Sequence, residues 1–80
     1  MPKRRVKLTF PETLITRPII YDLSRKFNVV FNIRRADVAD DRGWVILELE
    51  GTAESIDKGL EWAKKKGVRV DPVGGDVLEG

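Results

Sequence analysis

The stretch GWVILELEGTAESIDKGLEWAKKKG, residues 43–67, contains a strand pattern followed directly by a helix pattern. In residues 44–50 the side chains alternate with a period of two, which is typical of a strand with one buried face. We expect this strand to bury Val45, Leu47 and Leu49 and to turn its other face outward with Trp44, Ile46, Glu48 and Glu50.

Residues 52–67 carry the start and stop signals of a helix. Thr52 can cap the first turn, and Gly67 can end the helix in a left-handed conformation. Acidic residues lie near the start and lysines near the end, as the helix dipole favours. The stripe expected to face the core consists of Ala53, Ile56, Leu60 and Ala63, with Trp62 at its flank.

The residues before this stretch predict two further strands and one helix. Residues 5–10 alternate as a strand, and residues 11–17 form a connector. Pro18 suits the first turn of a helix that Thr16 or Arg17 would cap and that Asn28 would end. Residues 29–34 are the second predicted strand, and residues 37–43 its hairpin connection to the next. The helix stripe expected to be buried is Ile19, Ile20, Leu23 and Phe27.

A last strand is predicted over residues 68–72, at a sheet edge because Pro72 has no N–H to donate. The order β-α-β-β-α-β predicts an α+β fold: a ferredoxin-like βαββαβ sandwich, with a four-stranded antiparallel sheet and two helices on one face. Right-handed crossovers place the first and third strands in the centre. We expect one domain over residues 1–80, with a core at 5–73 and a loose tail at 74–80.

The composition argues against catalysis. The 80 residues include no Cys and no His, which excludes thiol chemistry, zinc knuckles and the commonest general base. The acidic residues Asp37, Asp40 and Asp41 miss the spacing of a calcium loop and are interpreted as turn formers. Glu48 and Glu50 lack the apolar surroundings of a catalytic acid. We therefore expect no enzyme, no cofactor and no metal.

The net charge is +2, but residues 1–36 carry nine Lys or Arg and two Asp or Glu, while residues 37–80 carry six and eleven. In the predicted sheet, Arg5 and Lys7 share a face with Glu48 and Glu50, so we interpret the charges as a neutralised solvated face, with an anion-binding patch as the alternative. The basic start lacks the apolar run of a signal peptide, and no apolar stretch could span a membrane. A cytoplasmic protein without membrane insertion is expected.

Six short segments carry a family resemblance through their order and spacing. They are Leu8-Thr9-Phe10, Pro18-Ile19-Ile20, Lys26-Phe27-Asn28-Val29, Asn32-Ile33-Arg34, Leu47-Glu48-Leu49-Glu50-Gly51 and Gly67-Val68-Arg69-Val70. Over about residues 5–73 the chain resembles the NIL domain, which is named after an Asn-Ile-Leu signature. The signature departs at Arg34, where the family has Leu.

The resemblance implies an ACT-like module that senses a small molecule. NIL domains occur at the C-terminus of the ATPase subunits of methionine importers, where they bind methionine and inhibit transport, and others are fused to iron-sulfur ferredoxin segments. This chain has neither a phosphate-binding glycine loop nor a cysteine. It would be a stand-alone copy, regulatory or accessory to sulfur amino-acid metabolism or transport. The family's ligand-contacting asparagine corresponds to Asn32.

Asn32 and Arg34 are the candidate ligand-binding residues. Asn32 offers both a donor and an acceptor, and Arg34 can pair with a carboxylate, so together they suit a zwitterionic amino acid. The alternative is that Asn32 bonds to backbone and Arg34 is solvated. Methionine or a related amino acid is the ligand that the resemblance implies.

Val30, Trp44 and Ile46 are predicted to lie on the sheet face without helices, where an apolar patch needs a cover. We expect a second copy to supply it in a homodimer, which the resemblance also implies. Trp44 could instead pack against residues 37–42 of its own chain. At the level of function, the alternatives are a ligand-free domain that docks to a protein partner and, from Arg42-Gly43-Trp44, an RNA-binding sheet.

Overall fold

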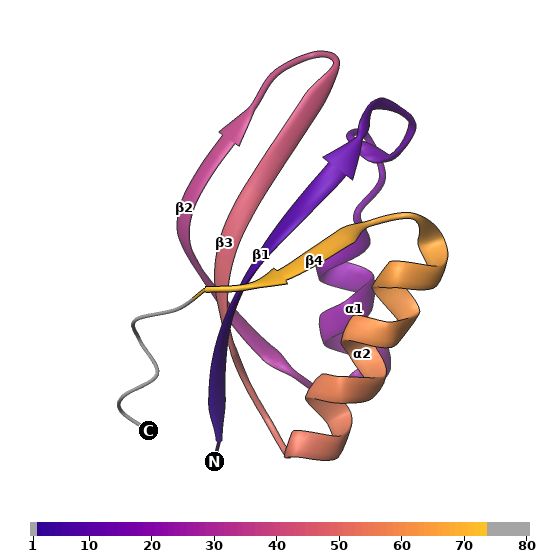
Figure 1. Ribbon diagram of the computed structural model, residues 1–80. Coiled ribbons are helices and arrows are strands. Elements are labelled where there is room, and N and C mark those ends of the chain that lie inside the picture. Colours follow the sequence, from indigo (N-terminus) through magenta and orange to yellow (C-terminus); the bar gives the residue numbers. More distant parts are fainter. Residues whose placement is uncertain (1, 74–80) are drawn as a thin grey trace.

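The computed structural model describes residues 2–73, which form a four-stranded antiparallel sheet with helices on one side (Figure 1). In chain order the elements are β1 (Lys3–Pro11), the short 3-10 helix η1 (Glu12–Leu14), α1 (Ile19–Phe27), β2 (Val30–Val38), β3 (Arg42–Glu50), α2 (Ala53–Lys66) and β4 (Arg69–Pro72). The strand order is β2-β3-β1-β4. The ferredoxin-like fold with two central strands is confirmed. The predicted tail at 74–80 lies outside the described residues.

The pairing of the two central strands shows which side chains lie on each face of the sheet. β1 and β3 pair from Lys3 opposite Glu50 to Pro11 opposite Arg42. In this register Val6 lies opposite Leu47 and Leu8 opposite Val45, and these four side chains are buried. Because neighbouring residues of a strand point to opposite faces, the polar residues between them are turned away from the helices.

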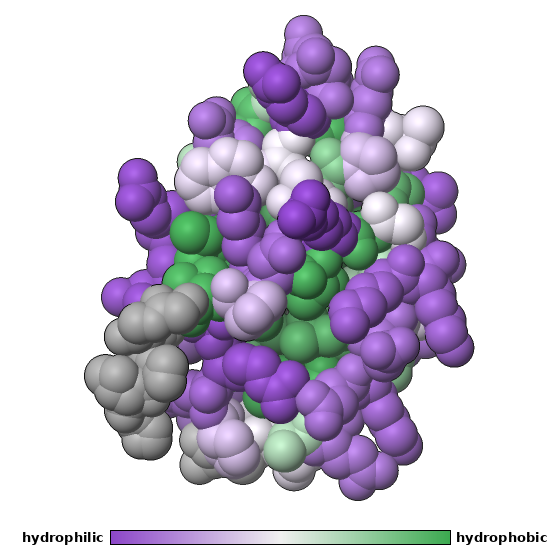
Figure 2. All heavy atoms as spheres, viewed as in Figure 1, coloured by the Kyte–Doolittle hydropathy of each residue, from purple (hydrophilic) through white to green (hydrophobic). Residues whose placement is uncertain are grey.

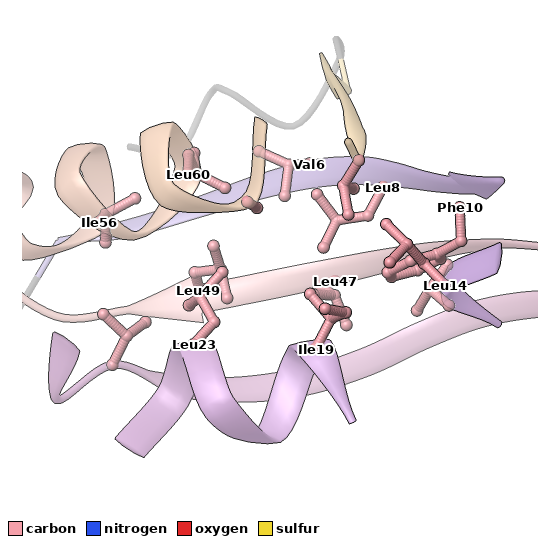
Figure 3. Packing of buried hydrophobic residues seen from close by; sticks show 14 residues of the cluster. Val6, Leu8, Phe10, Leu14, Ile19, Leu23, Leu47, Leu49, Ile56 and Leu60 are labelled. Carbon is pink, nitrogen blue, oxygen red and sulfur yellow. The ribbon is translucent and has the colours of Figure 1, made fainter. Parts of the chain in front are cut away.

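The helices cover the buried face of the sheet with leucine and isoleucine side chains. Figure 3 shows Ile19 and Leu23 of α1 and Ile56 and Leu60 of α2 directed toward Leu47 and Leu49 of the sheet. Trp62 packs at the flank of this core, as predicted, with its ring 5.9 Å from that of Phe27.

The predicted stripe of α2 was wrong at Ala53, which is exposed, and it omitted Gly59, which is buried. Ala53 is the first residue of α2, so it lies at the end of the helix. A Cβ atom at Gly59 would come within 3.2 Å of Leu23 Cδ2. The missing side chain therefore lets α2 approach α1 closely.

The predicted ends of α2 are confirmed. Thr52 Oγ1 accepts a hydrogen bond of 3.0 Å from the backbone N–H of Ser55, and Gly67 ends the helix with a φ of 110°. Asn28 ends α1 in the left-handed region, with a φ of 57°, also as predicted. Both helices thus end where a residue tolerant of positive φ occurs in the sequence.

The predicted start of α1 was wrong. Pro18 precedes the helix instead of lying in its first turn, and no side chain caps the helix, so neither Thr16 nor Arg17 has the expected role. The cause is a tight turn in the connector, where Ile19 N–H donates to Arg17 O over 2.8 Å. The turn places Pro18 immediately before the helix, and the side chain of Pro18 has no oxygen that could accept a hydrogen bond from the first turn.

The paired strands of the β2–β3 hairpin extend farther than predicted, and the loop between them is shorter. Pairing continues to Val38 opposite Gly43, and Ala39 N–H donates to Arg42 O over 2.8 Å to close the turn. The polar composition of residues 37–43 suggested a loop, but β2 is an edge strand and its residues from 32 to 38 are all exposed. Solvated polar side chains do not oppose strand pairing at such an edge.

Only α2 has a side-chain cap at its start, so we expect a substitution at this cap to lower the stability of the protein. We expect Thr52→Ala to lower the free energy of unfolding by about 1 kcal/mol, because it removes the acceptor for Ser55 N–H. In a domain of this size such a loss corresponds to a decrease of about 4–8 °C in melting temperature. Thr16→Ala is the matched control, since Thr16 caps nothing, and it should leave the melting temperature unchanged. Equal losses in both variants would contradict the assigned caps.

Candidate functional site

An apolar cavity of about 210 Å³ lies where the end of β1, the connector, the start of α1 and the β2–β3 hairpin meet. Its lining is largely aliphatic and aromatic, and it is partly open to solvent. The lining residues are Phe10, Leu14, Ile15, Arg17, Pro18, Ile19, Ile20, Tyr21, Val38 and Val45. Such a concave apolar space with few polar groups is typical of a small-molecule site.

The polar groups at this cavity favour an anion. Arg17 is the one charged residue of its lining. The first turn of α1 begins there without a side-chain cap, and within residues 2–73 no acceptor is found for the backbone N–H groups of Ile20 and Tyr21. Free N–H groups and the helix dipole make a helix N-terminus electropositive. Arg17 and the first turn of α1 are therefore the parts of the lining that could attract a carboxylate.

Tyr21 forms a wall of the cavity that its neighbour holds in place. Arg25, one helical turn later, donates a hydrogen bond of 2.8 Å from Nη1 to Tyr21 Oη. The guanidinium carbon of Arg25 also lies 5.5 Å from the centre of the Tyr21 ring. The phenol is 54% exposed, so this double contact restricts a ring that would otherwise rotate freely in solvent.

Asn32 and Arg34 do not line the cavity. Asn32 lies opposite Glu48 on the sheet face without helices, where it was predicted. The register of β2 shifts between Ile33 and Arg35, so Arg34 has no cross-strand partner and Arg35 is the residue opposite Ile46. A bulge of this kind places two residues opposite one and ends the simple alternation. The expected juxtaposition of Asn32 and Arg34 by a spacing of two is thus altered, and their role in binding stays a prediction.

On the open sheet face one basic residue, Arg5, pairs with an acidic residue as predicted, whereas Lys7 lies against Trp44. Arg5 lies opposite Glu48, with Nη2 3.4 Å from Oε2, and both side chains are half-buried. The ammonium of Lys7 lies 4.9 Å from the centre of the Trp44 ring. Figure 2, in the view of Figure 1 with β4 in front, shows apolar patches between predominantly hydrophilic side chains.

Trp44 and Ile46 are half-buried on this face, while Val30 is 66% exposed. Val30 lies opposite Glu50 near the start of β2. The strongly exposed large hydrophobic residues are otherwise Tyr21, Ile33 and Val38, so most of them belong to β2. The cover that a second copy would give to Val30, Trp44 and Ile46 stays a prediction.

Among residues 2–73 no group of three or more acidic side chains is placed to hold a metal ion. The described part of the chain also contains no helix long and apolar enough to span a membrane.

Sequence reasoning missed the cavity. The signal that could have revealed it is the connector, in which Leu14 and Ile15 are apolar although they lie between two prolines and outside any predicted element. Leu14 is buried in the core, whereas Ile15 is only partly buried and lines the cavity.

Comparison with protein families gives a match to the NIL domain over residues 4–72. The chain belongs to the NIL domain family. Among solved structures, it is similar to the C-terminal domain of an ABC transporter ATP-binding protein from Enterococcus faecalis. That comparison has a TM-score of 0.78 and 21% sequence identity and covers 91% of this chain and 86% of the other, so it shows a shared fold. A search of curated proteins gives no match.

We expect the Arg5–Glu48 ion pair on the open face of this NIL domain to contribute modestly to the free energy of unfolding. We expect Glu48→Ala to lower the free energy of unfolding by about 1 kcal/mol, because it leaves a half-buried guanidinium without that carboxylate. Glu54→Ala is the control, because Glu54 pairs with Lys58 at 3.1 Å on an exposed helix surface, and it should cost about 0.3–0.5 kcal/mol. Urea unfolding measures both. A loss at Glu48 no larger than at Glu54 would contradict this assignment.

Proposed function

We propose that this NIL domain is a regulatory module that binds methionine or a related small amino acid and does not catalyse a reaction. The observation that carries the proposal is the apolar cavity with one guanidinium and an uncapped helix start at its lining. Membership of the family supports a ligand of this class, and the module would act in the cytoplasm on sulfur amino-acid metabolism or transport.

The size and walls of the cavity suit a small apolar side chain. Its volume of about 210 Å³ is below the range of about 300–1,000 Å³ that is common for sites of drug-sized ligands. Phe10 and Tyr21 supply aromatic walls. A thioether is polarisable and gains from contact with aromatic rings, so methionine suits these walls better than an aliphatic chain of equal length.

The carboxylate of the ligand would bind beside Arg17 and the first turn of α1. Charge-assisted hydrogen bonds to a guanidinium are stronger than neutral ones, and the amides of Ile20 and Tyr21 are free to donate. The apolar part and the acidic part of an amino acid would then be recognised by different residues, which gives selectivity for ligands that carry both.

Regulation would follow from linkage in a homodimer. A ligand shifts an equilibrium between two arrangements only by the difference in its affinity for them. The cavity is built from elements that meet only through tertiary contacts, β1, α1 and the tip of the hairpin. Its occupation would therefore favour the arrangement in which these elements are held together.

The proposal predicts that methionine raises the melting temperature and binds measurably by calorimetry. A ligand at 100 times its Kd adds about 2.7 kcal/mol to the stability of the folded state. We expect Arg17→Gln to weaken methionine binding about tenfold or more, because a charged hydrogen bond is worth about 1.5–3 kcal/mol. Arg42→Gln removes an exposed charge outside the lining and should leave the affinity unchanged.

The same titration distinguishes the cavity from Asn32 and Arg34. Methioninol, which lacks the carboxylate, should bind wild type as weakly as methionine binds Arg17→Gln. If Asn32→Ala or Arg34→Gln abolishes binding while Arg17→Gln does not, the ligand lies on β2 instead of in the cavity. If none of the proteinogenic amino acids binds at millimolar concentration, the sensing function is wrong.

A second candidate function is docking to a protein partner without a small ligand. The exposed hydrophobic residues of β2 favour it, and the similar solved structure is the C-terminal domain of a transporter ATPase. This function would be favoured if no amino acid raised the melting temperature and the protein formed a stable complex of defined composition with a protein partner.

A further inference from the structure

The lining of the cavity contains both buried residues and residues that solvent reaches. Phe10, Ile19 and Val45 belong to the buried core, so the packing around them fixes their positions. Val38 is 58% exposed and is the one lining residue that comes from β2. Ile15 is only partly buried and comes from the connector. Substitution of Ile15 or Val38 should therefore disturb the core less than substitution of a buried lining residue.

The side chains of Ile15 and Val38 meet above a glycine of the central strand β3. A Cβ atom at Gly43 would lie 3.2 Å from Ile15 Cδ1 and 3.3 Å from each methyl carbon of Val38. Gly43 is itself buried and lies opposite Val38 in the sheet. Because both side chains reach the same point above Gly43, they lie next to each other. Together they separate this part of β3 from the cavity, whose lining includes Ile15 and Val38 but not Gly43.

The register of β3 places these two side chains away from the start of α1. Ile19, the first residue of α1, is directed toward Leu47 of β3 (Figure 3). On the same face of the sheet, Val45 precedes Leu47 and lines the cavity, and Gly43 precedes Val45 near the start of the strand. A ligand with its carboxylate at the first turn of α1 would thus extend over Val45 toward the side chains above Gly43.

We propose that Ile15 and Val38 form the end wall of the cavity and determine the longest ligand side chain that it accepts. This assignment rests on the proposed function and adds to it the residues that set its specificity. The close approach of both side chains to β3 requires that residue 43 have no side chain of its own.

An end wall of aliphatic groups discriminates between ligands by their length. A side chain that fits between the first turn of α1 and the end wall keeps both its apolar contacts and the contacts of its carboxylate. A longer side chain must displace Ile15 or Val38, or else lose the carboxylate contacts. One methylene group too many in an apolar pocket lowers affinity about tenfold or more. Ethionine is methionine with one further methylene group, so the two amino acids differ in length and not in charge.

The variant Val38→Ala tests the half of the end wall that β2 supplies, because it removes the methyl groups above Gly43. In calorimetry, we expect wild type to bind methionine about tenfold or more tightly than ethionine, and Val38→Ala to bind both about equally. Val30→Ala is the matched control, since Val30 is a valine of the same strand, is 66% exposed and does not line the cavity. It should keep the preference of wild type. Circular dichroism verifies that each variant is folded.

The variant Ile15→Val tests the half of the end wall that the connector supplies. It removes only Cδ1, the atom that lies above Gly43, and should shift the preference toward ethionine in the same direction. Ile33→Val is its matched control, because Ile33 is 51% exposed and lies outside the lining.

The outcomes separate the end wall from the sensing function. If Val38→Ala and Ile15→Val keep the preference of wild type for methionine, the end wall is overturned and the sensing function stands. Equal shifts in the controls overturn it too, because the effect would not be local to the cavity. So does a wild type that binds ethionine as tightly as methionine. A wild type that binds none of the proteinogenic amino acids at millimolar concentration overturns both the end wall and the sensing function.

Discussion

The pairing of β1 with β3 is the constraint on which the other features of this domain depend. These two strands are central in the sheet and carry Leu8, Leu47 and Leu49, whose side chains are completely buried. Because side chains alternate, a slip of β1 by one residue would move Leu8 and its buried neighbours on β1 to solvent and bring Arg5 and Lys7 under the helices. Such a slip would lose buried apolar side chains and bury charges, so the register is strongly specified. The same register determines which side chains of β1 and β3 lie on the open face.

Much of this arrangement could be predicted from the sequence because it depends on local patterns. The alternation in residues 44–50 and the signals at Thr52, Asn28 and Gly67 act over a few residues, and each is found where it was predicted. The order of elements then leaves few topologies, since crossovers are right-handed and sheet edges favour residues such as Pro72.

What could not be predicted depends on contacts between distant segments. The bulge at Arg34 is a property of the pairing between β2 and β3, and β3 follows in the sequence only after the hairpin. Asn32 could be assigned to a face because it precedes the bulge, whereas the alternation fails for Arg34 because Arg34 lies in it. The cavity is likewise formed by four segments that meet only in the folded chain. A single sequence shows their apolar residues but not the space between them.

The position of the bulge also determines how a ligand could influence the exposed edge of the sheet. Val38 lines the cavity on one side of the bulge, and the exposed residue Ile33 lies on the other. Both residues belong to β2, which is paired on one edge within the described chain and is exposed at eight of its nine residues. A strand with so little burial can shift at a lower cost than β1 or β3, which lie between neighbours. Ligand contacts at Val38 would therefore act first on β2, and the central pair of strands would keep the rest of the fold unchanged.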